Sequence, residues 1–334
     1  MATIKQIIEH YHDVWVFCEV RDKKIMPVSL ELINEGKNLA KTLNERLCVI
    51  LLGKAVREVA EELLYHGVDI VYLVEGEIFE YYTTEAYTTA VSTLIEKYKP
   101  AIVLYGATHI GRDLAPRIAA RINTGLTADC TALAIDEQSR NLQQTRPAFG
   151  GNLMATILCP ENRPQMSTVR PGVFEKSERS REKTGQIITE DMHIENDEIR
   201  TKVLQVVKLK KEMESLADAK IIIAGGNGIG CKESFELLSA LAKKLNGTIA
   251  ASRAAVDAGW IEHDRQVGQT GCTVKPDLYI AFGISGAVQH LAGMHNAKKI
   301  VAVNTNKNAP IFEIAHYGLV GDWKEIATLM LAQF

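Results

Sequence analysis

The apolar and polar positions of residues 14–122 switch repeatedly between two periods. Strand-like apolar runs lie at 14–20, 47–53, 69–75 and 101–108. The run LCVILLG at 47–53 is apolar throughout, which is typical of a strand covered on both faces. Segments with the helical spacing of apolar residues follow the strands, at 29–43, 55–67, 83–98 and 111–122. This alternation predicts a parallel sheet covered by helices.

The pattern changes from Ala128 to Phe174, where shorter extended segments follow one another. We place them in the same domain, as a continuation of the sheet. Residues 175–202 are dense in charge, and we interpret them, with the stretch KLKKEMES at 208–215, as an exposed connection. We therefore predict an N-terminal α/β domain over 1–205, which includes the charged connection 175–205, and a second domain over 206–334.

The second half of the chain repeats the alternation of strands and helices. Strand-like runs lie at 220–226, 248–252, 277–283, 300–304 and 318–321, and residues 231–245 have helical spacing. Five strands with helices between them predict a doubly wound sheet, in which ligands bind at the carboxyl ends of the strands. Ser252, Gly283 and Asn304 stand at three such ends.

Composition narrows the class of protein. A chain of 334 residues is long enough for two domains, and its net charge of −3 gives no global argument for nucleic acid as a partner. There is no signal-peptide core and no apolar run of about 18 residues, so we expect a cytoplasmic protein without membrane insertion. The six cysteines never form CxxC, which argues against zinc and iron–sulfur sites and favours buried reduced thiols.

The candidate chemistry lies in polar loops of the second half. The segments GGNGIG (225–230), VGQTG (267–271) and GISGAVQH (283–290) each join or face a strand-like run, and Ser252-Arg253 adds a hydroxyl and a cation. Glycine lets another group approach the backbone closely, so such loops can place N–H groups around a phosphate or a polar ring edge. Together they indicate one large ligand of nucleotide-cofactor size. We expect a helix to start near Ala287, with His290 one turn inside it.

Other interpretations of each feature stay open at this point. GGNGIG lacks the G-x-G-x-x-G register and can be a tight turn only, Arg253 can belong to a surface ion pair, and His290 can be a partly buried histidine with satisfied partners. No catalytic motif is present, so we name no catalytic residue and no metal ligand. A nucleotide-binding module without redox turnover and an enzyme that uses NAD both remain alternatives.

Longer segments of the sequence resemble those of a known family. SRAAVDAGW, KPDLYIAFGISGAVQHLAGM and YGLVGDW, with GATHIGRDLAPRIAARI and STVRPGVF in the first half, resemble the alpha subunit of electron transfer flavoproteins over residues 14–325. The resemblance implies an α/β protein of two domains. The N-terminal one would be an adenine-nucleotide α-hydrolase-like parallel sheet without a nucleotide of its own. The C-terminal one would be a doubly wound, DHS-like domain that binds FAD.

The resemblance also implies roles for residues. Arg253 and Thr270 would approach the flavin ring, His290 would reach its O2 edge, and Thr270 would offer a hydrogen bond at N5. Asn227 departs from the family's usual arginine in GGRG, and Trp323 from its usual leucine. The FAD-binding candidates are Asn227, Ser252, Arg253, Val267, Gly268, Gln269, Thr270, Gly271, Ser285, Gly286, Ala287, Val288, Gln289, His290, Asn304, Asp322 and Trp323.

Partners follow from the same resemblance. It implies an αβ heterodimer with an electron transfer flavoprotein beta subunit, which exchanges single electrons with acyl-CoA dehydrogenases. RDKKIMPVSLELINEGKNLAKTL, TTEAYTTAV and TRPAFGGNLMATI resemble alpha subunits from anaerobes, which would add electron bifurcation, with NADH used through the beta subunit and ferredoxin as a further acceptor. A plain carrier for acyl-CoA dehydrogenases is the alternative.

Overall fold

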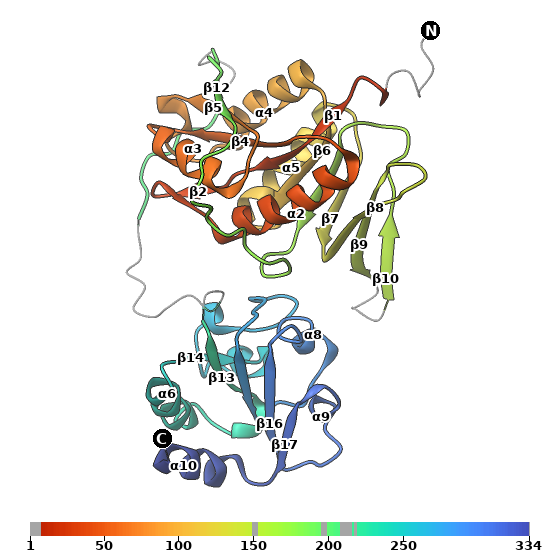
Figure 1. The fold of residues 1–334 in the computed structure, drawn as a ribbon. Coiled ribbons are helices and arrows are strands. Elements are labelled where there is room, and N and C mark those ends of the chain that lie inside the picture. Colours follow the sequence, from red (N-terminus) through yellow and green to blue (C-terminus); the bar gives the residue numbers. More distant parts are fainter. Residues whose placement is uncertain (1–7, 149–152, 195–198, 208–215, 217–218, 334) are drawn as a thin grey trace. The chain divides into compact units, whose positions relative to one another are not determined.

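The computed structural model describes residues 8–148, 153–194, 199–207, 216 and 219–333, and Figure 1 shows its fold. The chain divides into two compact units. Unit 1 comprises Met1–Pro147 with Met154–Val207, and unit 2 comprises Ala148–Leu153 with Lys208–Phe334. The stretch 208–215, which we interpreted as part of an exposed connection, lies outside the described residues.

Unit 1 is built on a parallel seven-stranded sheet with the order β12-β5-β4-β1-β6-β11-β7 (Figure 1). Its strands are β1 (His12–Phe17), β4 (Leu47–Gly53), β5 (Ile70–Glu75), β6 (Pro100–Gly106), β7 (Leu126–Cys130), β11 (Gln165–Val169) and β12 (Gln186–Thr189). The predicted strand at 47–53 is confirmed at both ends. It is apolar throughout because Val49 packs in the cluster on one face and Ile50 in the cluster on the other.

Helices cover both faces of this sheet. The cluster on one face contains residues of α2 (Pro27–Leu43) and α3 (Arg57–Leu63), which a 3-10 turn at Leu64–His66 extends. The cluster on the other face contains residues of α4 (Thr84–Tyr98) and α5 (His109–Arg121). A short hairpin of β2 (Val20–Arg21) and β3 (Lys24–Ile25) precedes α2. The predicted parallel sheet with helices between its strands is confirmed.

Three expectations from the sequence need correction. Only β7 and β11 of the segment 128–174 continue the sheet, because β8 (Ala132–Ile135), β9 (Leu142–Ala148) and β10 (Leu153–Ile157) form a separate three-stranded sheet. The charged segment 175–202 is more than a connection, since β12 within it pairs with β5 at the edge of the main sheet. Cysteine burial also differs, because Cys231 is exposed, and only Cys18, Cys48 and Cys130 are buried.

Unit 2 is a parallel five-stranded sheet with the order β14-β13-β15-β16-β17 (Figure 1). Its strands are β13 (Ile221–Gly225), β14 (Thr248–Ala251), β15 (Leu278–Phe282), β16 (Lys299–Asn304) and β17 (Tyr317–Val320). Taken along the chain, this is the order 2-1-3-4-5 of a doubly wound sheet, as predicted. The direction of winding reverses between β13 and β15, so the carboxyl ends of these strands mark the expected ligand site.

The helices of unit 2 also cover both faces. Residues of α6 (Ser234–Lys244) and α10 (Trp323–Gln333) pack with Ile223 and Phe282 in one cluster. The opposite cluster contains residues of α8 (Val288–Leu291) and α9 (Ile311–Ile314). The short helix α7 (Arg253–Asp257) follows β14 directly. Within the described part of the chain, no helix has the length and apolar character that crossing a membrane requires.

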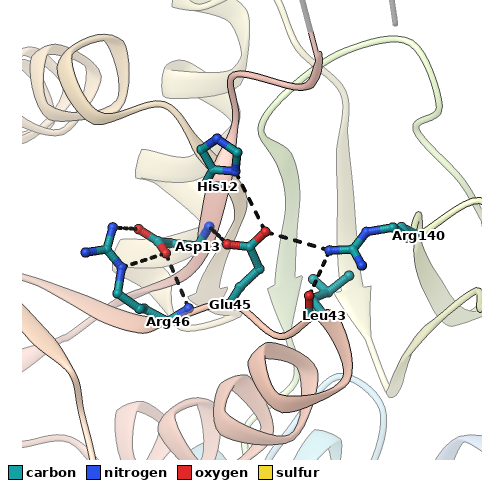
Figure 2. Close-up of polar contacts among 6 residues, drawn as sticks. All are labelled: His12, Asp13, Leu43, Glu45, Arg46 and Arg140. Carbon is teal, nitrogen blue, oxygen red and sulfur yellow. Dashed lines mark hydrogen bonds and ion pairs between the residues drawn. The ribbon is translucent and has the colours of Figure 1, made fainter.

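A polar network holds the amino-terminal ends of β1 and β4 together in unit 1 (Figure 2). The Arg46 guanidinium donates to both carboxylate oxygens of Asp13, from Nε at 3.0 Å and from Nη2 at 2.6 Å. The backbone N–H of Asp13 in turn donates to Glu45 at 3.2 Å, and Arg140 donates to the Leu43 carbonyl at 2.8 Å. Asp13 is buried, so its carboxylate depends on the hydrogen bonds that Arg46 donates to it.

We expect Arg46→Leu to lower the free energy of unfolding of the full chain by about 1.5–3 kcal/mol, because it removes charge-assisted hydrogen bonds from a buried carboxylate. Arg140→Leu is the matched control, since the Arg140 side chain is as exposed as that of Arg46 (59% against 57%) but donates one hydrogen bond to a carbonyl and lies 3.7 Å from the Glu45 carboxylate, which is less buried than Asp13. Arg140→Leu should lower the free energy of unfolding by less than about 1 kcal/mol. Urea unfolding followed by circular dichroism measures both, and equal losses would contradict the assignment.

Candidate functional site

A cavity of about 690 Å³ lies at the carboxyl edge of the unit 2 sheet. This volume falls in the range of small-molecule and cofactor sites. Its wall comes from the loops that follow β13, β14, β15 and β16, at the place where the strand order predicts a ligand. The lining residues are Asn227, Gly228, Ser252, Arg253, Ala254, Asp257, Gln266, Val267, Gly268, Gln269, Thr270, Gly283, Ile284, Ser285, Ala287, Gln289, His290 and Asn304.

Backbone hydrogen bonds tie these loops to one another. The N–H of Val267 donates to the carbonyl of Ala251 at the end of β14, at 2.9 Å. The N–H of Gln269 donates to the carbonyl of Gln289 in α8, at 2.7 Å. The segment 267–271 is therefore held between β14 and α8 by hydrogen bonds within the chain.

Glycine is required where the loops after β13 and β15 meet. A Cβ on Gly226 would lie 2.3 Å from the Gly283 carbonyl oxygen, and Gly283 itself has a φ of +61°. The N–H of Gly228 donates to the same carbonyl at 2.9 Å. GGNGIG thus forms a 3-10 turn (Asn227–Ile229) packed on the neighbouring loop, and α6 begins only at Ser234. The turn still places Asn227 and Gly228 on the cavity wall.

His290 is buried on α8, as a residue in the first turn of a helix that begins at Val288. Its Nε2 lies 3.1 Å from the hydroxyl of Tyr279, a fully buried residue of β15, and its Nδ1 has no hydrogen-bond partner among the described residues. Burial lowers the pKa of His290 to about 4, while a smaller contribution from the Val267 backbone acts the other way. The imidazole is therefore neutral near pH 7, and it can serve a ligand through hydrogen bonding rather than through charge.

Arg253 is the cation on the cavity wall that the sequence singled out. Its side chain is 68% exposed, and its Nε lies 3.2 Å from the Asp257 carboxylate one turn later in α7. The surface ion pair expected as one interpretation is confirmed, and Arg253 also borders the cavity, while its contact with a ligand stays a prediction. A ligand with negative charge would compete with Asp257 for the guanidinium.

Gln266 is a lining residue that the sequence analysis missed. Its buried amide Nε2 donates to the Thr270 hydroxyl oxygen at 2.9 Å. The signal was available, since an amide four residues before Thr270 can close a turn of this length. The motif VGQTG begins one residue after Gln266, so Gln266 was not among the candidates.

Five candidates lie outside the lining of this cavity. Gly271 and Gly286 serve close packing, since a Cβ on either would lie within 2.4 Å of the backbone of Gln266 or Ile311. Val288 is 43% exposed. Asp322 accepts the N–H groups of Lys324 and Glu325 at the start of α10, and Trp323 packs against the α6 cluster. Their contacts with a ligand stay predictions.

Comparisons with known proteins identify the class of this chain. Residues 14–195 match the family model of the electron transfer flavoprotein domain, and residues 215–295 match that of the electron transfer flavoprotein FAD-binding domain. The second match contains three of the polar loops that border the cavity. FAD is therefore the cofactor of the C-terminal domain.

Curated relatives cover almost the whole chain. The electron transfer flavoprotein subunit alpha of Thermoanaerobacterium thermosaccharolyticum is 52% identical over 97% of this chain and 98% of its own. Protein FixB of Clostridium saccharobutylicum is 51% identical over 98% and 97%. The acryloyl-CoA reductase electron transfer subunit beta of Anaerotignum propionicum is 44% identical over 99% and 98%. The chain belongs to the electron transfer flavoprotein alpha-subunit family, and this membership implies a beta subunit as its partner.

The cavity residues fit FAD chemically. Hydroxyl and amide groups of Ser252, Thr270 and Gln289 offer hydrogen bonds, and the unpartnered Nδ1 of His290 is a further group for a polar ligand. FAD supplies the one-electron and hydride chemistry when it is bound, and the chain supplies binding, orientation and the electrostatic surroundings. Among the described residues, no group of three or more His, Cys, Asp or Glu side chains could hold a metal ion.

The depressed pKa of His290 predicts a pH-dependent stability. An ordinary histidine pKa near 6.5 in the unfolded chain and one of about 4 in the folded chain mean that the unfolded state binds the extra proton between these values. The contribution is fully present above pH 6.5 and lost as the pH falls to 4. We expect the free energy of unfolding of the ligand-free chain to fall by up to about 3 kcal/mol across this window.

Urea unfolding at several pH values between 7.5 and 4 measures this loss. His290→Gln should flatten the slope, because glutamine does not titrate. His295→Gln changes an exposed histidine of the next turn and should leave the slope as it is. The explanation fails if both variants keep the slope of the parent chain.

Proposed function

We propose that this chain binds FAD in the unit 2 cavity and exchanges single electrons with an acyl-CoA dehydrogenase, as the alpha subunit of a cytoplasmic αβ heterodimer. The observation that supports it most is the convergence of separate loops on one cavity inside the matched FAD-binding domain. A non-redox nucleotide-binding module is less well supported, because the family that the chain matches is defined by electron transfer.

Each lining group has a role in this proposal. Arg253 and the neutral His290 provide a cation and a polar ring where negative charge develops on reduction, and Thr270 provides a hydroxyl. Electrostatic groups that are already in place stabilise such charge without reorganising. Gly268 has a φ of +149° beside α8, which lets the loop approach the Gln289 carbonyl closely.

Arg253→Ala in the FAD-loaded heterodimer tests the proposal. A hydrogen bond to a charged group contributes about 1.5–3 kcal/mol. At about 59 mV per tenfold change for one electron, the first reduction potential should fall by roughly 60–130 mV. Arg253→Lys keeps the charge and should shift it less, and Asp257→Asn removes the competing carboxylate and should not lower it. A redox titration measures all three.

Two results would contradict this assignment. A heterodimer that purifies without any flavin in the alpha chain would remove FAD from the cavity. If Arg253→Ala leaves the flavin potential unchanged, Arg253 does not contact the flavin. That result alone would still allow FAD to bind elsewhere on the carboxyl edge.

We further propose that the heterodimer takes part in flavin-based electron bifurcation. The support is the resemblance to alpha subunits from anaerobes and the 44% identity to the electron transfer subunit of an acryloyl-CoA reductase. In this scheme the beta subunit would hold a second FAD, which would accept hydride from NADH, and the site in this chain would hold the FAD that passes one electron of each pair to an acyl-CoA dehydrogenase. The other electron of each pair would reduce ferredoxin, so two NADH would supply the two electrons that one enoyl-CoA needs. The plain carrier, which only accepts electrons from acyl-CoA dehydrogenases, is the competing function.

The test mixes the heterodimer with NADH, an enoyl-CoA, its dehydrogenase and ferredoxin in the absence of oxygen. We expect ferredoxin reduction only when enoyl-CoA is present, and two FAD per heterodimer. Omitting the enoyl-CoA is the control for direct reduction by NADH. Uncoupled ferredoxin reduction, or a single FAD per fully loaded heterodimer, would favour the plain carrier.

A further inference from the structure

Gln266 and Thr270 form a pair on the wall of the cavity. Gln266 is 2% exposed, whereas Thr270 is exposed, and the amide Nε2 of the first lies 2.9 Å from the hydroxyl oxygen of the second. Both residues line the cavity. The pair therefore connects a buried, fixed amide with a hydroxyl that a ligand can reach.

The backbone on both sides holds Gln266 in place. Its N–H donates to the His263 carbonyl at 3.1 Å, and its carbonyl accepts the N–H of Cys272 at 2.8 Å. A parallel bridge joins it to Ala251 at the end of β14. A Cβ on Gly271 would lie 2.4 Å from the Gln266 carbonyl oxygen, so the loop closes tightly over this residue. The backbone of Gln266 is thus held by the end of β14 and by the turns on either side of it.

The hydrogen bond from Gln266 determines whether the Thr270 hydroxyl acts as a donor or as an acceptor toward a ligand. An amide NH₂ group is a donor only, and a threonine hydroxyl has one proton and two acceptor positions. Because Thr270 accepts from Gln266, its own proton is not used in this bond. The hydroxyl is left to donate that proton to another acceptor. An oxygen that accepts one hydrogen bond also becomes a better donor in the next, since such bonds polarise one another.

We propose that Gln266 is a positioning residue that sets Thr270 as a hydrogen-bond donor toward the ligand in this cavity. The ligand atom that Thr270 meets is then an acceptor, such as a ring nitrogen lone pair or a carbonyl oxygen. This inference rests on the proposed function, in which FAD occupies the cavity. It adds a residue outside the candidates that the sequence named, and it gives a structural reason for Thr270 to donate its proton.

The experiment uses the full chain in its heterodimer and measures the FAD dissociation constant and the first reduction potential of its flavin. Gln266→Met removes the donor but keeps a side chain of similar length. Gln266→Glu replaces the donor with a carboxylate, which accepts the Thr270 proton and so reverses the hydrogen bond. Thr270→Val keeps the shape of threonine without its hydroxyl, and it serves as the background for both changes at Gln266. Circular dichroism and thermal unfolding check that each variant is folded.

We expect Thr270→Val and Gln266→Met each to weaken FAD binding about fivefold, the equivalent of one ordinary hydrogen bond. Gln266→Glu should weaken it more than Gln266→Met and lower the potential, because the hydroxyl then no longer donates to the flavin. On the Thr270→Val background, Gln266→Met should have less than about a twofold further effect, and Gln266→Glu should keep only the part of its effect that comes from its charge. Such non-additivity is the signature of two residues acting as one unit.

Two results would overturn the inference while leaving the proposed function intact. One is an equal effect of the Gln266 changes with and without the Thr270 hydroxyl, which would make Gln266 a structural residue only. The other is a potential that Gln266→Glu leaves unchanged although Thr270→Val shifts it. If none of these variants, nor Arg253→Ala, changes FAD binding or potential, then the flavin lies elsewhere, and both the inference and the proposed function fail.

Discussion

Two backbone hydrogen bonds set the geometry on which the site depends. They hold the segment 267–271 between the end of β14, through Val267 and Ala251, and the start of α8, through Gln269 and Gln289. Backbone groups inside a protein must find partners, so this loop cannot move without leaving donors and acceptors unsatisfied. The positions of Gln266, Thr270 and His290 follow from it, because each lies on or beside the braced segment. A site on such loops is as rigid as the sheet edge that supports it.

The charge around the cavity is modest in the protein itself. His290 is neutral near pH 7 because of its burial, and Arg253 is partly balanced by Asp257. Placing a second permanent cation in a buried position would carry a desolvation penalty, whereas a neutral imidazole costs less. The arrangement leaves negative charge that develops on a bound ligand to Arg253 and to neutral hydrogen-bonding groups. This matches a cofactor whose oxidation state changes while it stays bound.

The sequence predicted those features that follow from local patterns. The strand LCVILLG was predicted with the observed ends because its residues pack alternately into two clusters. The polar loops after β13, β14 and β15 could be placed at one edge of the sheet because parallel strands run in the same direction. The edge strand β12 was missed because it has four residues inside a charge-dense segment. The pairing of Tyr279 with His290 was also invisible, since it depends on how α8 folds back on β15. Asp322 has a capping role at α10 that competes with the ligand role suggested by resemblance, and only the structure shows the first.

The two sheets of the chain use their carboxyl edges differently. In unit 1 the winding reverses between β1 and β6, and Glu19 lies just after β1 as a buried carboxylate. Thr108 donates to it at 2.6 Å and Arg21 at 2.7 Å, so this position carries an ion pair between protein groups. A buried carboxylate repels a phosphate, whereas the glycine-containing loops of unit 2 bring backbone and hydroxyl groups to the same place in the topology. The same α/β architecture therefore holds an ion pair between protein groups at this edge in one unit, and in the other the cavity that we propose for FAD.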